Sequence, residues 1–238
     1  MTEVTDKVMR PDPPTIWESA YSESYEASNY GKGLSGWVLT TSHKLIEANF
    51  RHSDKFSKIL EVGAGTGFHF DCVKHSFDEY WMTDNSAAML DQIKARMHDP
   101  RIRTSVEEGR ALSFPDNHFD RVIACHVLEH ANFNESDMAL KRWHDVLKSG
   151  GTLRVAVPDM EAHFSHYFYH KDLKALHSAF WGSQRHPYDY HKNGWDFQKL
   201  KEDLMAVGFS NIKRYDWRNT DHFYIDDYSQ SYYPHMDK

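Results

Sequence analysis

The sequence predicts an α/β protein built on a doubly wound, mostly parallel sheet. Short apolar runs alternate along the chain with segments whose apolar residues recur at helical spacing. The apolar run 59–62 leads directly into three glycines at alternate positions, namely Gly63, Gly65 and Gly67. A buried strand that ends in a glycine turn is typical of parallel sheets that bind a ligand at the carboxyl ends of their strands.

The remaining elements follow in the order that such a sheet requires. We expect strands over 59–62, 80–83, 101–106, 121–125, 152–157 and 209–215. We expect one helix over 34–50 and a second one whose buried face carries Phe70, Val73 and Phe77. Three more helices should follow: one after the N-cap Ser86, one from Ser136 to the Gly150-Gly151 pair, and one after Asp196. Residues 216–238 offer at most an irregular strand around 222–225, so the sheet should have six or seven strands.

The composition narrows the class of protein. The formal net charge of −7 argues against a general nucleic-acid binder, which needs a basic surface. No apolar run approaches the roughly 20 residues that span a membrane, and the start of the chain lacks a signal-peptide core. Cys72 and Cys125 are too few for a disulfide framework. We therefore expect a cytoplasmic protein that contacts neither nucleic acid nor membrane.

The glycine spacing discriminates between nucleotide cofactors. Dinucleotide-binding proteins carry G-x-G-x-x-G around a diphosphate, whereas this chain has G-x-G-x-G, with Glu61 two residues before Gly63. A carboxylate repels a diphosphate but suits a ligand that carries an ammonium group. About 20 residues after the first glycine, Asp84 ends the second expected strand, where a carboxylate can accept two hydrogen bonds from a ribose diol. The pattern therefore disfavours a nicotinamide dehydrogenase.

The motif around the glycines resembles that of a known family. The pattern Glu-x-Gly-x-Gly-x-Gly, which begins at Glu61, resembles the first motif of the class I S-adenosylmethionine-dependent methyltransferases. Later stretches also resemble this family: residues 107–120, His-Val-Leu-Glu-His at 126–130, and the order Gly-Gly, strand, proline over 150–158. The resemblance runs from residue 59 to residue 159. It implies a Rossmann-like methyltransferase fold that binds S-adenosylmethionine and releases S-adenosylhomocysteine.

The resemblance also implies which residues bind the cofactor. They are Glu61, Gly63, Ala64, Gly65, Gly67, Asp84, Asn85, Glu108, Gly109 and Cys125. Glu108 holds the position that usually carries an aspartate in contact with the adenine amino group, and Gly109 would offer its N–H to the ring. Cys125 lies where the chain leaves the fourth strand, beside the sulfonium. Glu108 and Ser113 depart from the aspartate and the proline that the family usually has.

The composition along the chain and the same resemblance together suggest how the chain is organised. We expect a disordered tail over residues 1–15 and a single methyltransferase domain over 16–238. Its parts would be an N-terminal cover (16–58), a cofactor-binding core (59–159), an acceptor-site insert (160–196), and the last helix, edge strand and tail (197–238). The insert is crowded with aromatic residues and histidines and resembles a polar loop over the acceptor. Each of its histidines, taken alone, fits a surface role better.

The expected function is methyl transfer to a small polar acceptor, such as a sugar or another metabolite with a hydroxyl or amine group. The protein mainly has to align donor and acceptor, and an oxygen acceptor must also lose a proton, for which histidine is suited. The candidates for that step are His191 first, then Asp159, His126 and His186. The alternative is a non-catalytic S-adenosylmethionine-binding regulatory or scaffold protein. The expected partners are the small-molecule acceptor and, in a homodimer, a second copy of the chain.

His126 and His130 have the spacing of metal ligands. Because they are four residues apart, they would share one face of a helical turn. No further ligand cluster is evident around them in the sequence, so we predict no metal site and expect His130 to fix the local turn.

Overall fold

The computed structural model describes residues 54–185 and 188–214. Several sequence predictions concern residues outside these ranges. They are the tail over 1–15, the helix over 34–50 with most of the cover over 16–58, His186, and the strand around 222–225.

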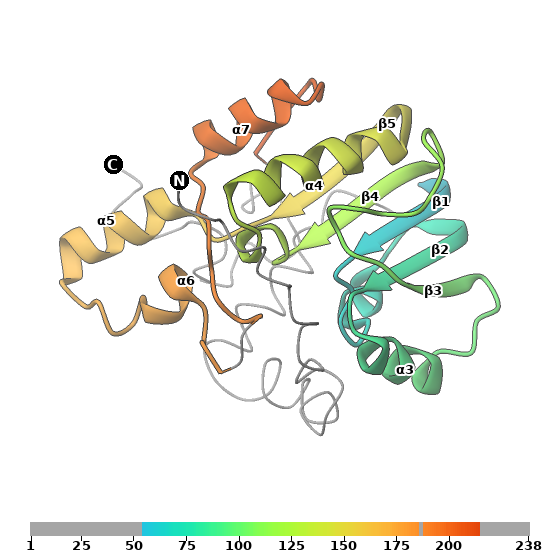
Figure 1. The fold of residues 1–238 in the computed structure, drawn as a ribbon, viewed down its shortest axis with the longest axis horizontal. Coiled ribbons are helices and arrows are strands. Elements are labelled where there is room, and N and C mark those ends of the chain that lie inside the picture. Colours follow the sequence, from blue (N-terminus) through green and yellow to red (C-terminus); the bar gives the residue numbers. More distant parts are fainter. Residues whose placement is uncertain (1–53, 186–187, 215–238) are drawn as a thin grey trace, which may run out of the picture.

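Five parallel strands form the described sheet, in the order β3-β2-β1-β4-β5 (Figure 1). Their bounds are β1 Lys55–Val62, β2 Ser76–Asp84, β3 Ile102–Val106, β4 Phe119–Cys125 and β5 Leu147–Ala156. The chain runs outward from β1 to β3 and then returns to place β4 on the other side of β1. In sheets with such a reversal, the ligand lies at the carboxyl ends of the strands beside it.

Helices cover both faces of this sheet. Their bounds are α3 Ala87–Arg96, α4 Phe133–Val146, α5 Met160–His170, α6 His177–Trp181 and α7 Phe197–Ala206, with the 3-10 helices η2 Phe68–Cys72 and η3 Leu128–His130. Successive residues of a strand point to opposite faces. Leu60 and Val122 pack into the core that includes α4 and α7, whereas Ile59 and Ile123 pack into the core that includes α3. The predicted doubly wound α/β fold is therefore confirmed.

Two helix starts follow directly from capping side chains. The Ser86 hydroxyl accepts a hydrogen bond from the N–H of Met89 and begins α3, as predicted. The Asp196 carboxylate accepts from the N–H of Lys199 at 2.7 Å and begins α7, again as predicted.

The helix expected after the glycine turn is wrong. Phe70 lies in η2, but Phe77 lies in β2, opposite Phe56 of β1. Because β2 already pairs with β1 from Ser76 onward, the chain between the glycines and β2 has room for only one short 3-10 helix.

The helix expected from Ser136 begins and ends earlier than predicted. Asn132 caps α4, and the chain passes straight from α4 into β5 at Leu147. Gly150 and Gly151 therefore lie within β5 and do not end a helix. Gly150 has a φ of 76°, and the register of β4 against β5 shifts at this point, as in a β-bulge.

The edge strand expected over 209–215 is also wrong for the residues that the structure describes. Residues 209–214 form no strand, and the left-handed φ of 54° at Asn211 interrupts an extended run. The guanidinium of Arg214 instead donates to the carboxylate of Asp159 at 3.0 Å. The described part of the sheet therefore has five strands, fewer than the expected six or seven.

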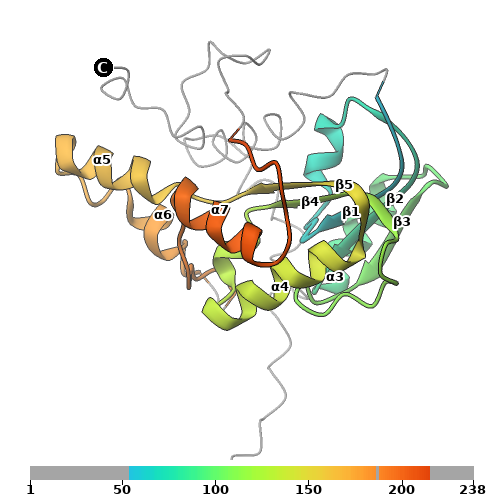
Figure 2. The ribbon, with the colours of Figure 1, turned by 90° about the horizontal axis from the view of Figure 1, so that it is seen from above.

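Two helices occupy much of the insert that was expected to be a loop. α5 and α6 lie beyond the carboxyl ends of β4 and β5 (Figures 1 and 2). The chain then returns to the sheet edge, where Trp195 forms a parallel bridge with Asp159 and its carbonyl accepts the N–H of Met160 at 2.8 Å. The insert thus brings residues 191–195 back to the end of β5. No helix among the described residues combines the length and apolar character needed to cross a bilayer.

Candidate active site

The glycine turn lies at the carboxyl end of β1. Gly63, Gly65 and Gly67 all have positive φ angles, of 66°, 55° and 80°, which favour glycine at each position. Gly63 is also required by packing, since a Cβ placed there would lie 2.5 Å from Cγ2 of Val127. The N–H of Ala64 donates to the carbonyl of Thr83 at 2.9 Å and fixes the turn to the end of β2.

Two carboxylates flank this turn. Asp84, the last residue of β2, accepts the N–H of Gly65 at 3.0 Å and the N–H of Ser86 at 2.9 Å. Burial raises the pKa of Asp84, although these backbone N–H groups oppose the shift. Glu61 is 4% exposed and accepts the hydroxyl of Tyr80 at 2.8 Å. A pair of carboxylates fits a cofactor with hydroxyl and ammonium groups, and would repel a diphosphate.

The other residues expected around the cofactor lie at or just after the carboxyl ends of β2, β3 and β4. Glu108 is exposed, with Oε1 2.5 Å from Nη2 of Arg110. Gly109 follows it, and its carbonyl accepts the indole N–H of Trp143 at 2.9 Å. Cys125 ends β4 and is buried, and burial raises the pKa of its thiol, as do the neighbouring charges of Glu129 and Glu61. Asn85 is exposed in the turn after β2.

The backbone is strained where the chain leaves β4. His126 has a φ of 55°, a conformation that residues other than glycine rarely adopt. Its N–H donates to the carbonyl of Ala156 at 3.0 Å, and its Nδ1 lies 3.1 Å from Oε1 of Glu129. Such strain persists only where the surroundings enforce it, and it concentrates at functional sites.

Glu129 is the centre of this region. The residue is only 1% exposed, yet its Oε2 has no hydrogen-bond partner in the part of the chain that the structure describes. Burial alone would raise the pKa of Glu129, but the hydrogen bond from His126 and the nearby imidazoles lower it to about 2. Its carbonyl accepts the N–H groups of Lys192 at 2.8 Å and Asn193 at 3.3 Å. The turn after β4 is therefore joined to the returning insert.

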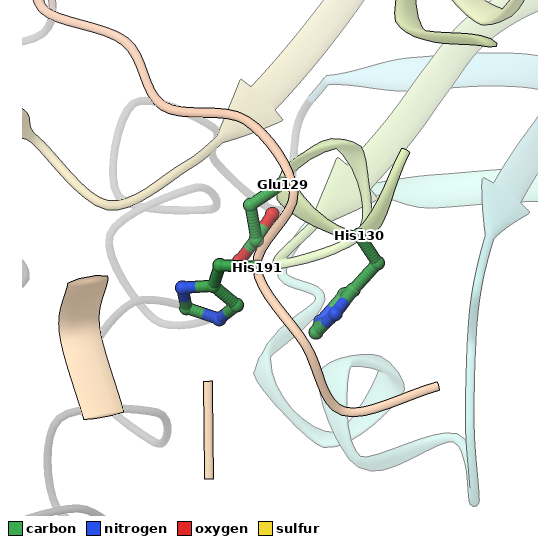
Figure 3. A group of neighbouring side chains, drawn as sticks. All are labelled: Glu129, His130 and His191. Carbon is green, nitrogen blue, oxygen red and sulfur yellow. The ribbon is translucent and has the colours of Figure 1, made fainter. Parts of the chain in front are cut away.

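The insert places His191 beside this carboxylate. Figure 3 shows Glu129 and His130 on the turn after β4, with the ring of His191 approaching from the returning insert. The rings of His130 and His191 are 5.1 Å apart between centroids. Nδ1 of His191 lies 2.9 Å from the carbonyl of Ala179, and burial lowers the pKa of this imidazole.

The structure brings together only some of the predicted catalytic residues. His191 and His126 both lie next to Glu129. Asp159 is engaged elsewhere: Oδ1 caps α5 by accepting the N–H of Glu161 at 3.0 Å, and Oδ2 pairs with Arg214. His186 lies outside the described residues. Glu129 was not named as a site residue from the sequence. Its position between His126 and His130, just after the fourth expected strand, was nevertheless a signal in the sequence.

The fold and this edge of the sheet define a class of protein. A parallel sheet with a reversal beside β1 and a glycine turn flanked by two carboxylates are features of an α/β protein that binds a nucleoside-containing cofactor.

The comparisons with known proteins identify the family. A family model described as "Methyltransferase domain" matches residues 59–151. The ubiquinone/menaquinone biosynthesis C-methyltransferase UbiE of Neisseria meningitidis is 34% identical over 189 residues, covering 71% of this chain and 73% of that protein. The chain belongs to the S-adenosylmethionine-dependent methyltransferase family. It is an enzyme, and its cofactor is S-adenosylmethionine.

Solved structures agree on the fold. The solved complex of the Trm112 methyltransferase activator of Haloferax volcanii with its partner gives a TM-score of 0.57 and 18% identity, covering 84% of this chain and 77% of that chain. An S-adenosylmethionine-dependent methyltransferase from Thermotoga maritima has a TM-score of 0.56 and 16% identity, covering 82% and 80% of the two chains. The sugar acceptor, the homodimer and the cytoplasmic location remain predictions from the sequence.

Proposed function

We propose that the acceptor is a small molecule with an ionisable hydroxyl group, held at Glu129, His130 and His191. The observation that supports this most is the cluster itself, which gathers two imidazoles and a buried carboxylate within 4.8 Å of one another. Imidazoles and carboxylates suit a group that both donates and accepts hydrogen bonds. An apolar acceptor would gain nothing from them and would leave them desolvated.

The cluster is suitably placed for an acceptor because it adjoins the glycine turn. Val127, the residue between His126 and η3, packs against Gly63 so closely that a side chain at Gly63 would collide with it. A molecule held at Glu129 would therefore lie next to the cofactor that the glycine turn binds. This proximity is what direct transfer between two bound molecules requires.

The residues that hold the cofactor are assigned by the same reasoning. We assign the ribose hydroxyls to Asp84, because each of its oxygens keeps a second lone pair after accepting a backbone N–H. We assign the ammonium side to Glu61, and the adenine to Glu108 and Gly109. Glu108 would have to share its carboxylate with Arg110, which makes it the weakest of these contacts.

The chemistry then divides between the cofactor and the chain. When bound, S-adenosylmethionine supplies a methyl group that its sulfonium has already activated. The chain's residues have to align the acceptor with that group and favour loss of the hydroxyl proton. His191 and His130 contribute to this as members of the cluster that holds the acceptor's hydroxyl. Asp159 is left out, because both of its oxygens serve the start of α5 and Arg214.

Two kinds of acceptor share the required hydroxyl. The relative from Neisseria meningitidis is named for C-methylation in ubiquinone and menaquinone biosynthesis. The reduced form of a quinone is a dihydroxylated aromatic ring, so we place a hydroxylated ring first. A sugar hydroxyl, which the sequence suggested, is the second candidate.

The test is methyl transfer from labelled S-adenosylmethionine to matched acceptors: a hydroxylated aromatic ring, a sugar and a primary amine. We expect transfer to a hydroxyl-bearing acceptor and none to the amine. His191→Ala should lower turnover by about 100-fold or more, a typical share for proton handling. Cofactor affinity should stay within about threefold, since His191 contacts the acceptor side.

The matched control is His177→Ala, which removes an exposed histidine whose ring lies next to that of Trp181 in α6, with 4.9 Å between the ring centroids. This variant should retain the turnover of the parent enzyme. Preferential methylation of the amine would overturn the proposed acceptor class, and normal turnover of His191→Ala would remove His191 from the reaction.

A further inference from the structure

Glu129, His130 and His191 each offer a ligand atom, and these atoms lie within 4.8 Å of one another (Figure 3). We propose that these three side chains form a binding site for a divalent first-row transition-metal ion, of the kind that Zn²⁺ represents. The sequence alone did not predict this site, because His191 is distant in the chain and the pair His126 and His130 lacked a third ligand.

The outer hydrogen bonds of the two histidines fix the nitrogens that face the site. Nδ1 of His191 lies 2.9 Å from the carbonyl of Ala179, and Nδ1 of His130 lies 3.2 Å from the carbonyl of Tyr190. A carbonyl oxygen can only accept, so each Nδ1 must carry the proton. In the neutral rings, Nε2 is then left with its lone pair. This is the arrangement that metal-binding histidines usually adopt.

The carboxylate of Glu129 likewise has one oxygen that a neighbouring side chain holds and one that is left over. Oε1 of Glu129 is held by Nδ1 of His126 at 3.1 Å, whereas Oε2 is buried without a hydrogen-bond partner in the described part of the chain. A buried polar atom without a partner is costly, and a missing ion is one recognised explanation. All three candidate ligands therefore have an orienting contact and an atom left over.

The ligands also come from backbone that is already fixed. Glu129 and His130 lie on η3, and the carbonyl of Glu129 accepts the N–H of Lys192, the neighbour of His191, at 2.8 Å. The N–H of His191 donates to the carbonyl of Trp181 at 3.2 Å. The two segments are thus joined next to the ligands, so binding an ion would need only small side-chain adjustments.

The ligand types indicate the class of ion. Two imidazoles and one carboxylate suit zinc, cobalt, iron and manganese, whereas magnesium and calcium prefer oxygen ligands alone. Three protein ligands also leave at least one coordination position for a further molecule, as in catalytic zinc sites. On the function proposed above, which this step rests on, that position would hold the acceptor's hydroxyl and favour its ionised form.

The binding test uses the purified full-length chain, stripped with a chelator and titrated with Co²⁺, whose visible absorption reports imidazole and carboxylate ligation. The chain has 17 histidines, so weak binding elsewhere is expected and stoichiometry decides. We expect one tightly bound Co²⁺ per chain, displaced by Zn²⁺ but not by Mg²⁺. His191→Ala and His130→Ala should each weaken this binding by about 100-fold or more, since even outer-contact changes cost 10- to 100-fold.

Two further variants make the test decisive. Glu129→Gln should also lose tight binding, and if it fails to fold, the two histidine variants carry the result. His98→Ala removes an exposed histidine just after α3 and should bind Co²⁺ as the parent does. Absence of tight binding in the parent, or tight binding that survives in both His191→Ala and His130→Ala, overturns the site.

The activity measurement separates this inference from the proposed function. If the chelator-treated enzyme methylates a hydroxyl-bearing acceptor at full rate and binds no Co²⁺, the metal site is wrong and the proposed function stands. If Co²⁺ binds at the three ligands but no hydroxyl-bearing acceptor is methylated, the site stands and the acceptor class is wrong.

Discussion

The proposed active site has a cofactor side, at the glycine turn and Asp84, and an acceptor side, at Glu129, His130 and His191. These two sides are held together by different kinds of contact. On the cofactor side, the carboxylate of Asp84 binds the N–H groups of Ser86 and Gly65, 2 and 19 residues away in the chain. On the acceptor side, the ring of His130 contacts the carbonyl of Tyr190, 60 residues away. A short motif can specify the first side. The second side forms only when the insert has folded back to the sheet.

The two sides meet at one packing contact. Val127 follows the strained His126 on the acceptor side, and its side chain fills the space that a Cβ at Gly63 would need. Changes at this contact should therefore affect both cofactor binding and acceptor placement, whereas changes away from it should affect one side alone.

The largest effect is expected for Gly63→Ala. The new Cβ would lie 2.5 Å from Cγ2 of Val127, and the φ of 66° would strain any side chain. Strain of about 1–2 kcal/mol and overpacking of about 1–3 kcal/mol should lower the free energy of unfolding and abolish detectable cofactor binding. Chemical denaturation and calorimetry with S-adenosylhomocysteine measure the two effects.

Two controls separate the strain from the collision. Gly150→Ala has a similar φ of 76°, but no described residue other than its chain neighbours has an atom within 4 Å of the new Cβ. This variant should therefore show the strain alone and leave cofactor binding intact. Adding Val127→Ala to Gly63→Ala removes both colliding methyl groups and should recover part of the lost stability. Equal destabilisation by Gly63→Ala and Gly150→Ala would show that the contact with Val127 is unimportant.

A smaller effect, confined to the cofactor side, is expected for Asp84→Ala. Loss of hydrogen bonds to a charged group should cost about 1.5–3 kcal/mol of cofactor affinity, or roughly 10- to 150-fold. Because Asp84 also accepts the N–H groups of Gly65 and Ser86, the free energy of unfolding should fall as well. Calorimetry and thermal unfolding measure the two quantities.

Asp84→Asn is the matched control, because it keeps a carbonyl oxygen for one backbone N–H but loses the charge. It should retain more stability than Asp84→Ala while still binding the cofactor weakly, and the KM for the acceptor should not change in either variant. Full cofactor affinity in a destabilised Asp84→Ala would assign Asp84 a structural role only.

The difference between the two sides also explains what could be predicted from the sequence. The end of the strand before the glycines, the position of Asp84 and the start of α3 at Ser86 were predicted in place. The start of that strand was not, because β1 begins at Lys55 and not at residue 59. Gly150 shows the limit of such local prediction. A glycine pair after a helical pattern predicts the end of the helix, but the pairing of β5 with β4 places Gly150 in a β-bulge.

The acceptor side could not be predicted to the same depth. His191 was named from the composition of its segment, but its partner Glu129 was not. The position of Glu129 between two histidines was a local signal, but such a signal does not record a contact across about 60 residues of chain. His130 was read as a residue that fixes its own turn, and its contact with Tyr190 arises only after α5 and α6 have positioned the returning chain.

The smallest effect is expected at the amino ends of the strands, which lie opposite the proposed active site. A change there should influence neither cofactor binding nor acceptor placement. Asp120 of β4 accepts the ammonium of Lys148 at 2.7 Å and the N–H of Lys58 at 2.8 Å. Burial would raise the pKa of Asp120, but these hydrogen bonds outweigh it and lower the pKa. Because the pKa is lowered on folding, Asp120 stabilises the fold at pH values above its unfolded pKa of about 3.9, and this stabilisation is lost as the pH falls through its folded pKa.

Asp120→Asn should therefore reduce the free energy of unfolding at pH 7 by about 1 kcal/mol, and the difference from the parent should shrink in acid. Denaturation series at several pH values measure this. Cofactor affinity and turnover should not change, and a loss of either would mean that the two ends of the strands are coupled.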